Sequence, residues 1–222
     1  ASELDWDAPE LVTAAPIETN AVIVPDFGSL PVPKKATTLS PSDLGGPKVM
    51  HGDPSELDLE DALARGTLIH KLLEYLPIIP PEKRLGLGLR LIQSDDQALV
   101  QEIIALIDKP ELAWLWAADA LTEVDITADL AGVGRIHGAI DRLIITDQKI
   151  TAIDYKSNKL VPETPVHTPL GLQRQLAAYY QALRAIYPDH EIEAAILWTH
   201  SGDLMVLPND LLHEALIGLA TP

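Results

Sequence analysis

The strongest constraint on the fold of this chain is the stretch from Gly134 to Lys156, which has the pattern of two β-strands joined by a tight turn. Apolar and β-branched residues run up to Ile145, a polar Thr-Asp-Gln-Lys break follows, and a second apolar run begins at Ile150. This succession is typical of a β-hairpin. The break lacks the glycine that the commonest two-residue turns prefer, so the sequence leaves the turn type open.

Two aspartates face each other if the turn is centred between Asp147 and Gln148. Asp141 and Asp154 are then equidistant from that centre, and their Cβ atoms are expected roughly 5 Å apart. Lys156 follows Asp154 by two residues and therefore emerges on the same face. Opposed carboxylates repel each other, so the pattern favours either a divalent cation between them or a proton on one of them.

These three side chains are suited to hydrolysing a phosphodiester with a metal-activated water, because the lysine adds a positive charge and a donor. A simpler interpretation is a solvated hairpin face with scattered charges, which a lone Asp-x-Lys pattern favours. The opposed Asp141 gives the two interpretations similar weight. The hairpin residues taken alone leave both of them open.

Further motifs, taken with the hairpin, resemble the RecB-type branch of the restriction-endonuclease-like PD-(D/E)XK nuclease superfamily. The likeness runs from about Leu39 to Pro208 and is closest to the C-terminal nuclease domain of AddA-type helicase-nucleases. Ser157 stands where that family usually has threonine, and both residues carry a hydroxyl. The blocks that carry the resemblance are, in chain order, Gly66 to Glu74 with His70, then Gly138-x-x-Asp141, Asp154-Tyr155-Lys156 and Gln175-x-x-x-Tyr179.

The resemblance implies an α/β fold, with a restriction-endonuclease-like mixed central sheet flanked by helices. It also implies a Mg²⁺ or Mn²⁺ site, and oxygen-rich ligand sets suit these hard cations. Lys156 would orient the attacking water and stabilise charge growing on the phosphate. The implied metal ligands are neutral His70, Asp141, Asp154 and the carbonyl of Tyr155, and the implied catalytic residues are Asp141, Asp154 and Lys156.

Three more residues enter through the same resemblance. Gln175 and Tyr179 are spaced i and i+4 on a predicted helix, so they lie side by side. The resemblance points them toward the active site or the DNA strand, whereas periodicity alone places Tyr179 in the core with Gln175 flanking it. Glu123 precedes the Gly-x-x-Asp strand and is a secondary candidate, as a ligand to a second metal or as a structural contact.

Composition excludes several classes of protein. The 222 residues contain no cysteine, which rules out disulfides, thiolate zinc sites and iron–sulfur clusters. AddB-like partner subunits carry a cysteine-ligated cluster, so the chain does not resemble them in that respect. No run of about 20 apolar residues is present, and we expect no membrane span. A net charge of −17 argues against a broad DNA-coating surface, because non-specific affinity depends on Lys and Arg.

The pattern along the chain predicts two regions. Residues 1–38 contain repeated prolines that break any long helix, and we expect a Pro-rich linker or arm there. Residues 39–222 are expected to form the nuclease domain, and the start at Ala1 leads us to expect a longer parent chain. Within the domain we expect helices at about 58–76, 95–108, 170–186 and 209–219, and strands at 121–130, 192–199 and 204–207 besides the hairpin.

Two local signals refine these helices. Ser94 begins a capping-box pattern and is expected to cap the helix at 95–108. Gly66 lies inside the helix at 58–76, where glycine costs about 1 kcal/mol relative to alanine. We therefore expect another segment to approach the helix closely at Gly66.

The combined prediction is a Mg²⁺- or Mn²⁺-dependent DNA exonuclease or endonuclease with little sequence preference. The resemblance places it in a bacterial, cytoplasmic helicase-nuclease of double-strand-break repair, with DNA, the rest of the helicase chain and an AddB-like subunit as partners. The alternative is a catalytically inactive nuclease-like module that docks a helicase partner, which the acidic composition and the arm would fit. Such a copy would be expected to lose a carboxylate or the lysine, whereas this chain retains Asp141, Asp154, Lys156 and His70.

Overall fold

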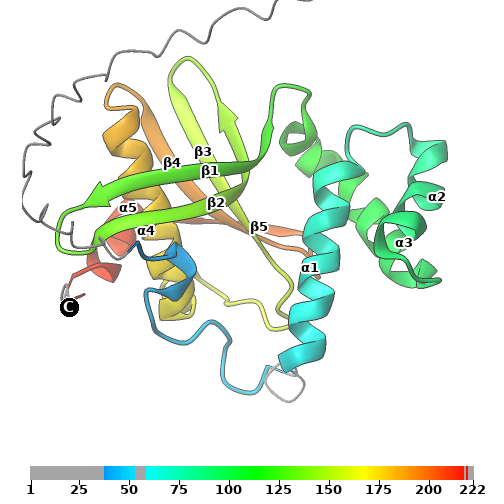
Figure 1. The fold of residues 1–222 in the computed structure, drawn as a ribbon, viewed down its shortest axis with the longest axis horizontal. Helices are drawn as coiled ribbons and strands as arrows, with labels where there is room; N and C mark the ends of the chain where they lie inside the picture. Colours follow the sequence, from blue (N-terminus) through cyan, green and yellow to red (C-terminus); the bar gives the residue numbers. More distant parts are fainter. Residues whose placement is uncertain (1–37, 54–58, 218, 220–222) are drawn as a thin grey trace, which may run out of the picture. The chain divides into compact units, whose positions relative to one another are not determined.

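The computed structural model describes residues 38–53, 59–217 and 219 (Figure 1). The Pro-rich arm expected over residues 1–38 lies outside these residues, except for Thr38, and so the boundary at residue 39 stays a prediction. No helix in the described part of the chain has the length and apolar character needed to cross a membrane.

A five-stranded mixed sheet forms the centre of the described region, with strand order β1-β2-β3-β4-β5. Strands β3 and β4 run parallel, and the other neighbouring pairs are antiparallel. Helix α4 (Leu170–Ile186) connects the parallel pair, as a parallel pair requires a crossover. The strands are β1 (Leu121–Leu130), β2 (Gly134–Ile145), β3 (Lys149–Lys156), β4 (Glu191–Trp198) and β5 (Asp203–Leu207).

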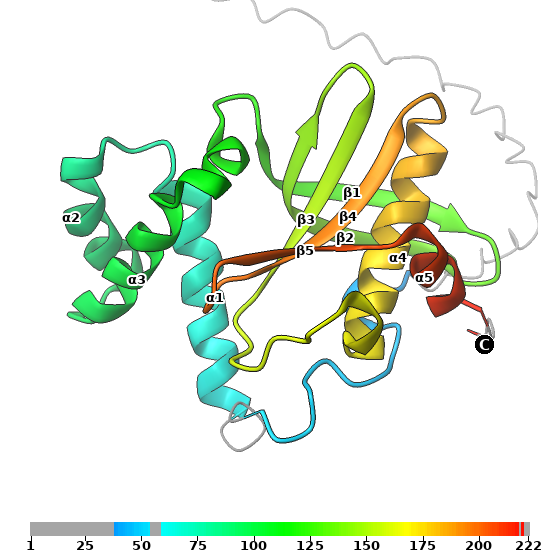
Figure 2. The same cartoon turned by 180° about the vertical axis from the view of Figure 1, so that it is seen from behind.

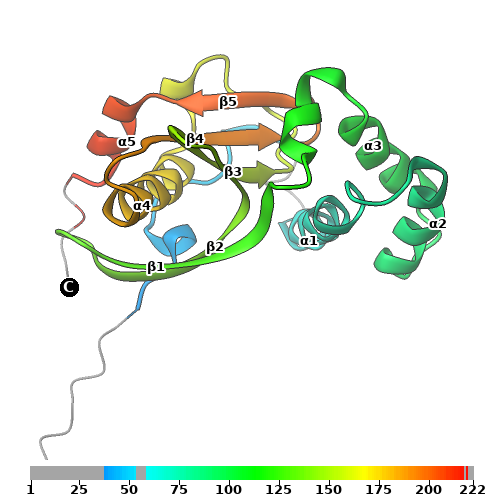
Figure 3. The same cartoon turned by 90° about the horizontal axis from the view of Figure 1, so that it is seen from above.

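Helices cover both faces of this sheet (Figures 1 and 2). Helices α4 and α5 (Asn209–Ala215) pack on one face, and Figure 3 shows the sheet curving around α4. Helices α1 (Leu59–Tyr75) and α3 (Gln97–Ile107) pack on the other. The remaining helices are η1 (Pro41–Asp43), α2 (Pro81–Ile92), η3 (Pro110–Trp116) and η4 (Pro165–His167). The expected α/β fold with a mixed, helix-flanked sheet is confirmed.

Strand β3 shows why the sheet has two cores. Its side chains alternate between the faces, as β-strand geometry requires. Ile150 and Ala152 pack with α4, whereas Ile153 and Tyr155 pack with α1 and α3. The strand is therefore buried on both sides, which suits its place in the middle of the sheet.

Three helices differ from the sequence-based expectation. Helix α5 ends at Ala215 instead of near residue 219. The N-cap of α3 is Asp96, whose side chain accepts a hydrogen bond from the Leu99 amide at 3.0 Å, while Ser94 Oγ accepts from the Asp96 amide. The prediction of a Ser94 cap was wrong because Asp96 is an equally good cap two residues later. Helix α2 was not predicted, since its leucines at 85, 87, 89 and 91 recur every second residue and obscure a helical period.

The hairpin turn lies where the sequence placed it. The β2–β3 ladder begins with Ile145 opposite Ile150, and the Thr146 amide donates to the Lys149 carbonyl at 2.9 Å. The Thr146 hydroxyl donates to the same carbonyl at 2.8 Å and accepts from the Lys149 amide at 3.0 Å. This side chain braces a turn that has no glycine.

Candidate metal centre and cleft

Strands β2 and β3 separate at the position of the two aspartates. Their paired residues end with Arg142 opposite Ile153, so Asp141 and Asp154 occupy the next position of the same register. Ile140 and Leu143 both pack in the core next to α4 although they are three residues apart, which shows that the two-residue alternation of β2 breaks between them. The sequence therefore predicted the register, but it did not predict the break beside Asp141.

The carboxylate of Asp141 spans the gap that this break leaves. Its Oδ2 accepts a hydrogen bond from the backbone amide of Tyr155 at 2.6 Å. The side chain is buried, with 8% of the residue exposed. Asp141 is thus fixed in place by a backbone donor on the neighbouring strand.

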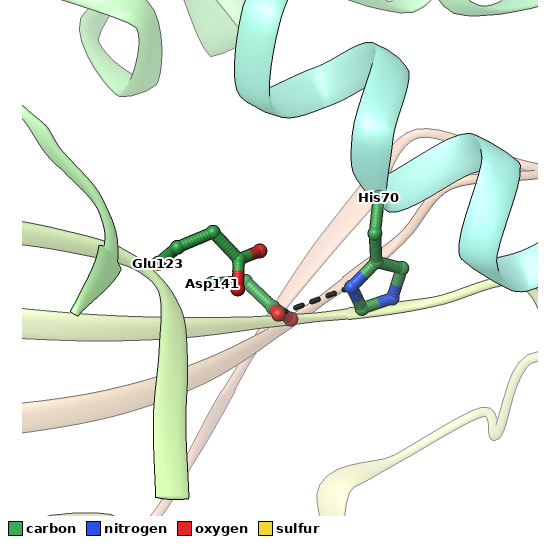
Figure 4. Close-up of side chains that lie close together, drawn as sticks. All are labelled: His70, Glu123 and Asp141. Atoms are coloured by element: carbon green, nitrogen blue, oxygen red, sulfur yellow. Dashed lines mark hydrogen bonds and ion pairs between the residues drawn. The ribbon is translucent and has the colours of Figure 1, made fainter. Parts of the chain in front are cut away.

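Helix α1 brings His70 to the same point. Its Nδ1 lies 3.1 Å from Asp141 Oδ1 (Figure 4). Its Nε2 lies 3.1 Å from the carbonyl oxygen of Tyr155. The imidazole also meets the Tyr155 ring edge-on, with ring centroids 5.6 Å apart. Residues that are 71 and 85 positions apart in the chain are therefore in direct contact.

Glu123 completes the group from strand β1. The flanking pairs Thr122–Arg142 and Val124–Ile140 place it opposite Asp141. Its φ is +48°, a left-handed conformation that is costly for a non-glycine residue in a strand. One ligand atom from each of His70, Glu123 and Asp141 lies within 4.8 Å of the others, and no other such group occurs among the described residues (Figure 4).

Asp154 belongs to a second polar group beside the first. Its Oδ2 forms an ion pair with Lys156 Nζ, and its Oδ1 accepts from Gln175 Nε2 at 2.8 Å. Gln175 also donates to the Tyr179 hydroxyl, which donates in turn to the Ala139 carbonyl at 2.7 Å. Helix α4 thus supplies Gln175, which contacts Asp154 directly, and Tyr179, which contacts Gln175.

Burial and neighbouring charges shift the pKa values of three groups at the site. Burial raises the pKa of Asp154, and the neighbouring Asp141 adds to this, although Lys156 opposes it. Burial and Asp141 likewise raise the pKa of Glu123. Burial lowers the pKa of His70, but the hydrogen bond and charge of Asp141 outweigh it, and the pKa is raised. Any cation bound here would compete with protons on these groups.

A cleft of about 470 Å³ opens over the two groups. His70, Glu123, Lys156 and Gln175 line it together with residues of α1 and of the segment 42–49. The site is therefore open to a substrate on one side.

Gly66 lies on the part of α1 that lines the cleft. A Cβ added to Gly66 would lie 3.4 Å from Ser157 Oγ, which identifies the close approach expected at that glycine.

Residues of the segment 42–49 line this cleft, a role that sequence patterns did not reveal, and neighbouring residues anchor the segment to β2 and α4. The Leu39 amide donates to the Arg135 carbonyl at 2.8 Å, and the Gly171 amide donates to the Pro47 carbonyl at 2.8 Å. A Cβ on Gly138 would lie 2.8 Å from Pro41 Cδ. Gly138 could have predicted this packing from the sequence, because a glycine in a strand interior often marks the close approach of another segment.

Comparison with known proteins gives three results. A model of the PD-(D/E)XK nuclease superfamily matches residues 44–204, a range that includes every candidate residue described above. No curated protein matches the chain. The crystal structure of SSO0001 is similar with 18% sequence identity and a TM-score of 0.33, and the match covers 73% of this chain and 89% of that one.

Proposed function

Because the chain belongs to the PD-(D/E)XK nuclease superfamily, we propose that it is a metal-dependent nuclease domain that hydrolyses phosphodiester bonds in DNA. The observation that carries the proposal is the convergence of His70, Glu123 and Asp141 beside the Asp154–Lys156 ion pair. Three different elements supply the first group, and the cleft opens over both.

The residues present fit a divalent cation. An imidazole nitrogen and two carboxylates lie within 4.8 Å of one another, and the pKa of Glu123 is raised by burial and by the charge of Asp141. His70, Glu123 and Asp141 would hold the ion, with Asp154 and the Tyr155 carbonyl as further donors. Mg²⁺ or Mn²⁺ would supply a Lewis acid that activates water and neutralises phosphate charge.

Lys156 has the position expected of a group that acts on the substrate. It lines the cleft and forms an ion pair with Asp154. A charged donor beside the phosphate would orient the attacking water and stabilise the negative charge of the transition state. Gln175 holds the other oxygen of Asp154, so Asp154 and Lys156 form a preorganised pair.

A finer assignment extends this proposal. The order and spacing of the motifs support an AddA-type, RecB-like nuclease domain of a bacterial, cytoplasmic helicase-nuclease that repairs double-strand breaks. The net charge of −17 supports a domain that receives its strand from a helicase chain, because few basic groups are available to bind DNA tightly. An AddB-like subunit would be the partner.

The decisive experiment compares the protein with its Asp141→Asn variant. Calorimetric titration with Mn²⁺ and cleavage of single-stranded and duplex DNA are measured on both. We expect the wild type to bind Mn²⁺ and cleave, and the variant to lose both properties. A wild type that binds no metal and leaves DNA intact would instead identify the inactive docking module.

A further inference from the structure

Arg142 is a buried cation with no ion-pair partner in the part of the chain that the structure describes. Only 2% of the residue is exposed, and its Nη2 atom has no hydrogen-bond partner among the described residues. A guanidinium stays charged at any ordinary pH, and burying a charge costs several kcal/mol unless other groups compensate. For comparison, the buried Arg84 pairs with Asp108 at 2.6 Å. Arg142 therefore needs an explanation.

Arg142 contacts Tyr155, Ala120 and Trp116. Arg142 Nε donates to the Tyr155 hydroxyl at 3.2 Å, and Nη1 lies 3.5 Å from the Ala120 carbonyl. The guanidinium stacks over the Trp116 ring, 5.1 Å from its centroid. The bond from Nε is therefore the contact through which Arg142 holds the Tyr155 side chain.

Tyr155 contacts two of the three grouped side chains. Its amide donates to Asp141, its carbonyl lies 3.1 Å from His70 Nε2, and its ring packs edge-on against the His70 ring. A shift of this tyrosine would therefore move two of the three grouped side chains. The Arg142 side chain holds the Tyr155 ring through the hydroxyl. The Tyr155 ring and backbone in turn contact His70 and Asp141.

We propose that Arg142 is a positioning residue that preorganises the metal centre through the Tyr155 hydroxyl. It touches neither the grouped ligand atoms nor the cleft, so it acts through Tyr155. This inference rests on the proposed function, because it assumes that His70, Glu123 and Asp141 bind a cation. Residues that orient metal ligands typically contribute 10- to 100-fold to metal affinity.

The test is a set of Mn²⁺ titrations by calorimetry on the whole chain, with thermal unfolding of each metal-free variant. We expect Tyr155→Phe and Arg142→Met each to raise the dissociation constant for Mn²⁺ at least tenfold. Because both changes break one link, the double variant should bind about as weakly as either single variant. The matched controls, Arg84→Met and Tyr180→Phe, should lower the unfolding temperature or leave it unchanged, and bind Mn²⁺ as the wild type does.

Tyr155→Phe removes only the hydroxyl and keeps the ring, so it tests the role of this hydroxyl even if Arg142→Met does not fold. A Tyr155→Phe protein that binds Mn²⁺ as tightly as the wild type overturns the inference, whatever its thermal stability, because the hydroxyl would then serve packing only. A wild type that binds no Mn²⁺ would overturn the proposed metal centre itself, and the inference with it. The two failures are therefore distinguishable.

Discussion

Asp141 and Asp154 extend the β2–β3 register by one position, yet their carboxylates bind different partners. Asp141 contacts His70 and the Tyr155 amide, whereas Asp154 contacts Lys156 and Gln175. The strands separate at this position, and the break lets two aspartates from one hairpin serve two adjoining groups. In our proposal the first group holds the cation, Asp154 adds a donor to it, and Lys156 acts on the phosphate.

Replacing Lys156 should separate catalysis from metal binding. In Lys156→Ala we expect DNA cleavage to fall by about 10²- to 10³-fold, because the transition state loses a preorganised positive group. Mn²⁺ affinity should change little, since Lys156 is not among the grouped ligand residues. The exposed Lys159 gives the control, and Lys159→Ala should cleave normally. Undiminished cleavage by Lys156→Ala would remove the assigned role.

Replacing Asp154 should affect both properties. Asp154→Ala deletes an anion beside the metal centre and leaves Lys156 without its partner. We expect weaker Mn²⁺ binding in calorimetry and loss of cleavage in the same assay. Asp154→Ala lacks both the carboxylate and the ion pair with Lys156. Cleavage at the wild-type rate by this variant would therefore contradict the proposed active site.

Metal should stabilise the folded protein through the site. At a Mn²⁺ concentration of about 100 times its dissociation constant, linkage predicts roughly 2.7 kcal/mol of added stability. For a chain of this size that corresponds to an increase in Tm of about 5–10 °C. A chelator should reverse the increase in thermal unfolding experiments. Asp141→Asn should show no such response, and an equal increase in that variant would place the metal elsewhere.

The backbone of Glu123 should reveal a conflict between stability and metal binding. Its left-handed conformation costs a non-glycine residue about 1–2 kcal/mol, which glycine does not pay. We expect Glu123→Gly to be about 1 kcal/mol more stable than Glu123→Gln in denaturant titrations, while both lose Mn²⁺ affinity. Asp125 is the control, because its φ is not positive. There we expect the Gly variant to be less stable than the Gln variant.

Gly138 should be intolerant of even one methyl group. The added Cβ of Gly138→Ala would lie 2.8 Å from Pro41 Cδ and 3.6 Å from the Tyr179 hydroxyl. Overpacking of this kind costs about 1–3 kcal/mol, and we expect a lower unfolding temperature. Gly86→Ala is the control, because that exposed helical site has room for the methyl and should gain up to about 1 kcal/mol. If Gly138→Ala matches the wild type in stability, Pro41 does not pack against β2 as described.

Local patterns in the sequence determined much of the fold. Strand β1 and helix α4 have the predicted limits, and the turn at Asp147–Gln148 has the predicted centre. These features depend on residues close together in the chain, where periodicity and turn chemistry act directly. Local patterns were less reliable where two signals competed, as at Ser94 and Asp96, or where spacing hid the period, as in α2.

The sequence alone also placed Lys156 on the same face as Asp154, because that relationship follows from the two-residue alternation of a strand. The family resemblance implied that His70 and Asp141 share a metal, but no local rule joins a helix to a strand 71 residues away, and the contact depends on the tertiary structure. The break in β2, the strained φ of Glu123 and the buried charge of Arg142 likewise depend on which strands and helices pack together. Local propensities formed the elements, and long-range packing assembled the candidate site.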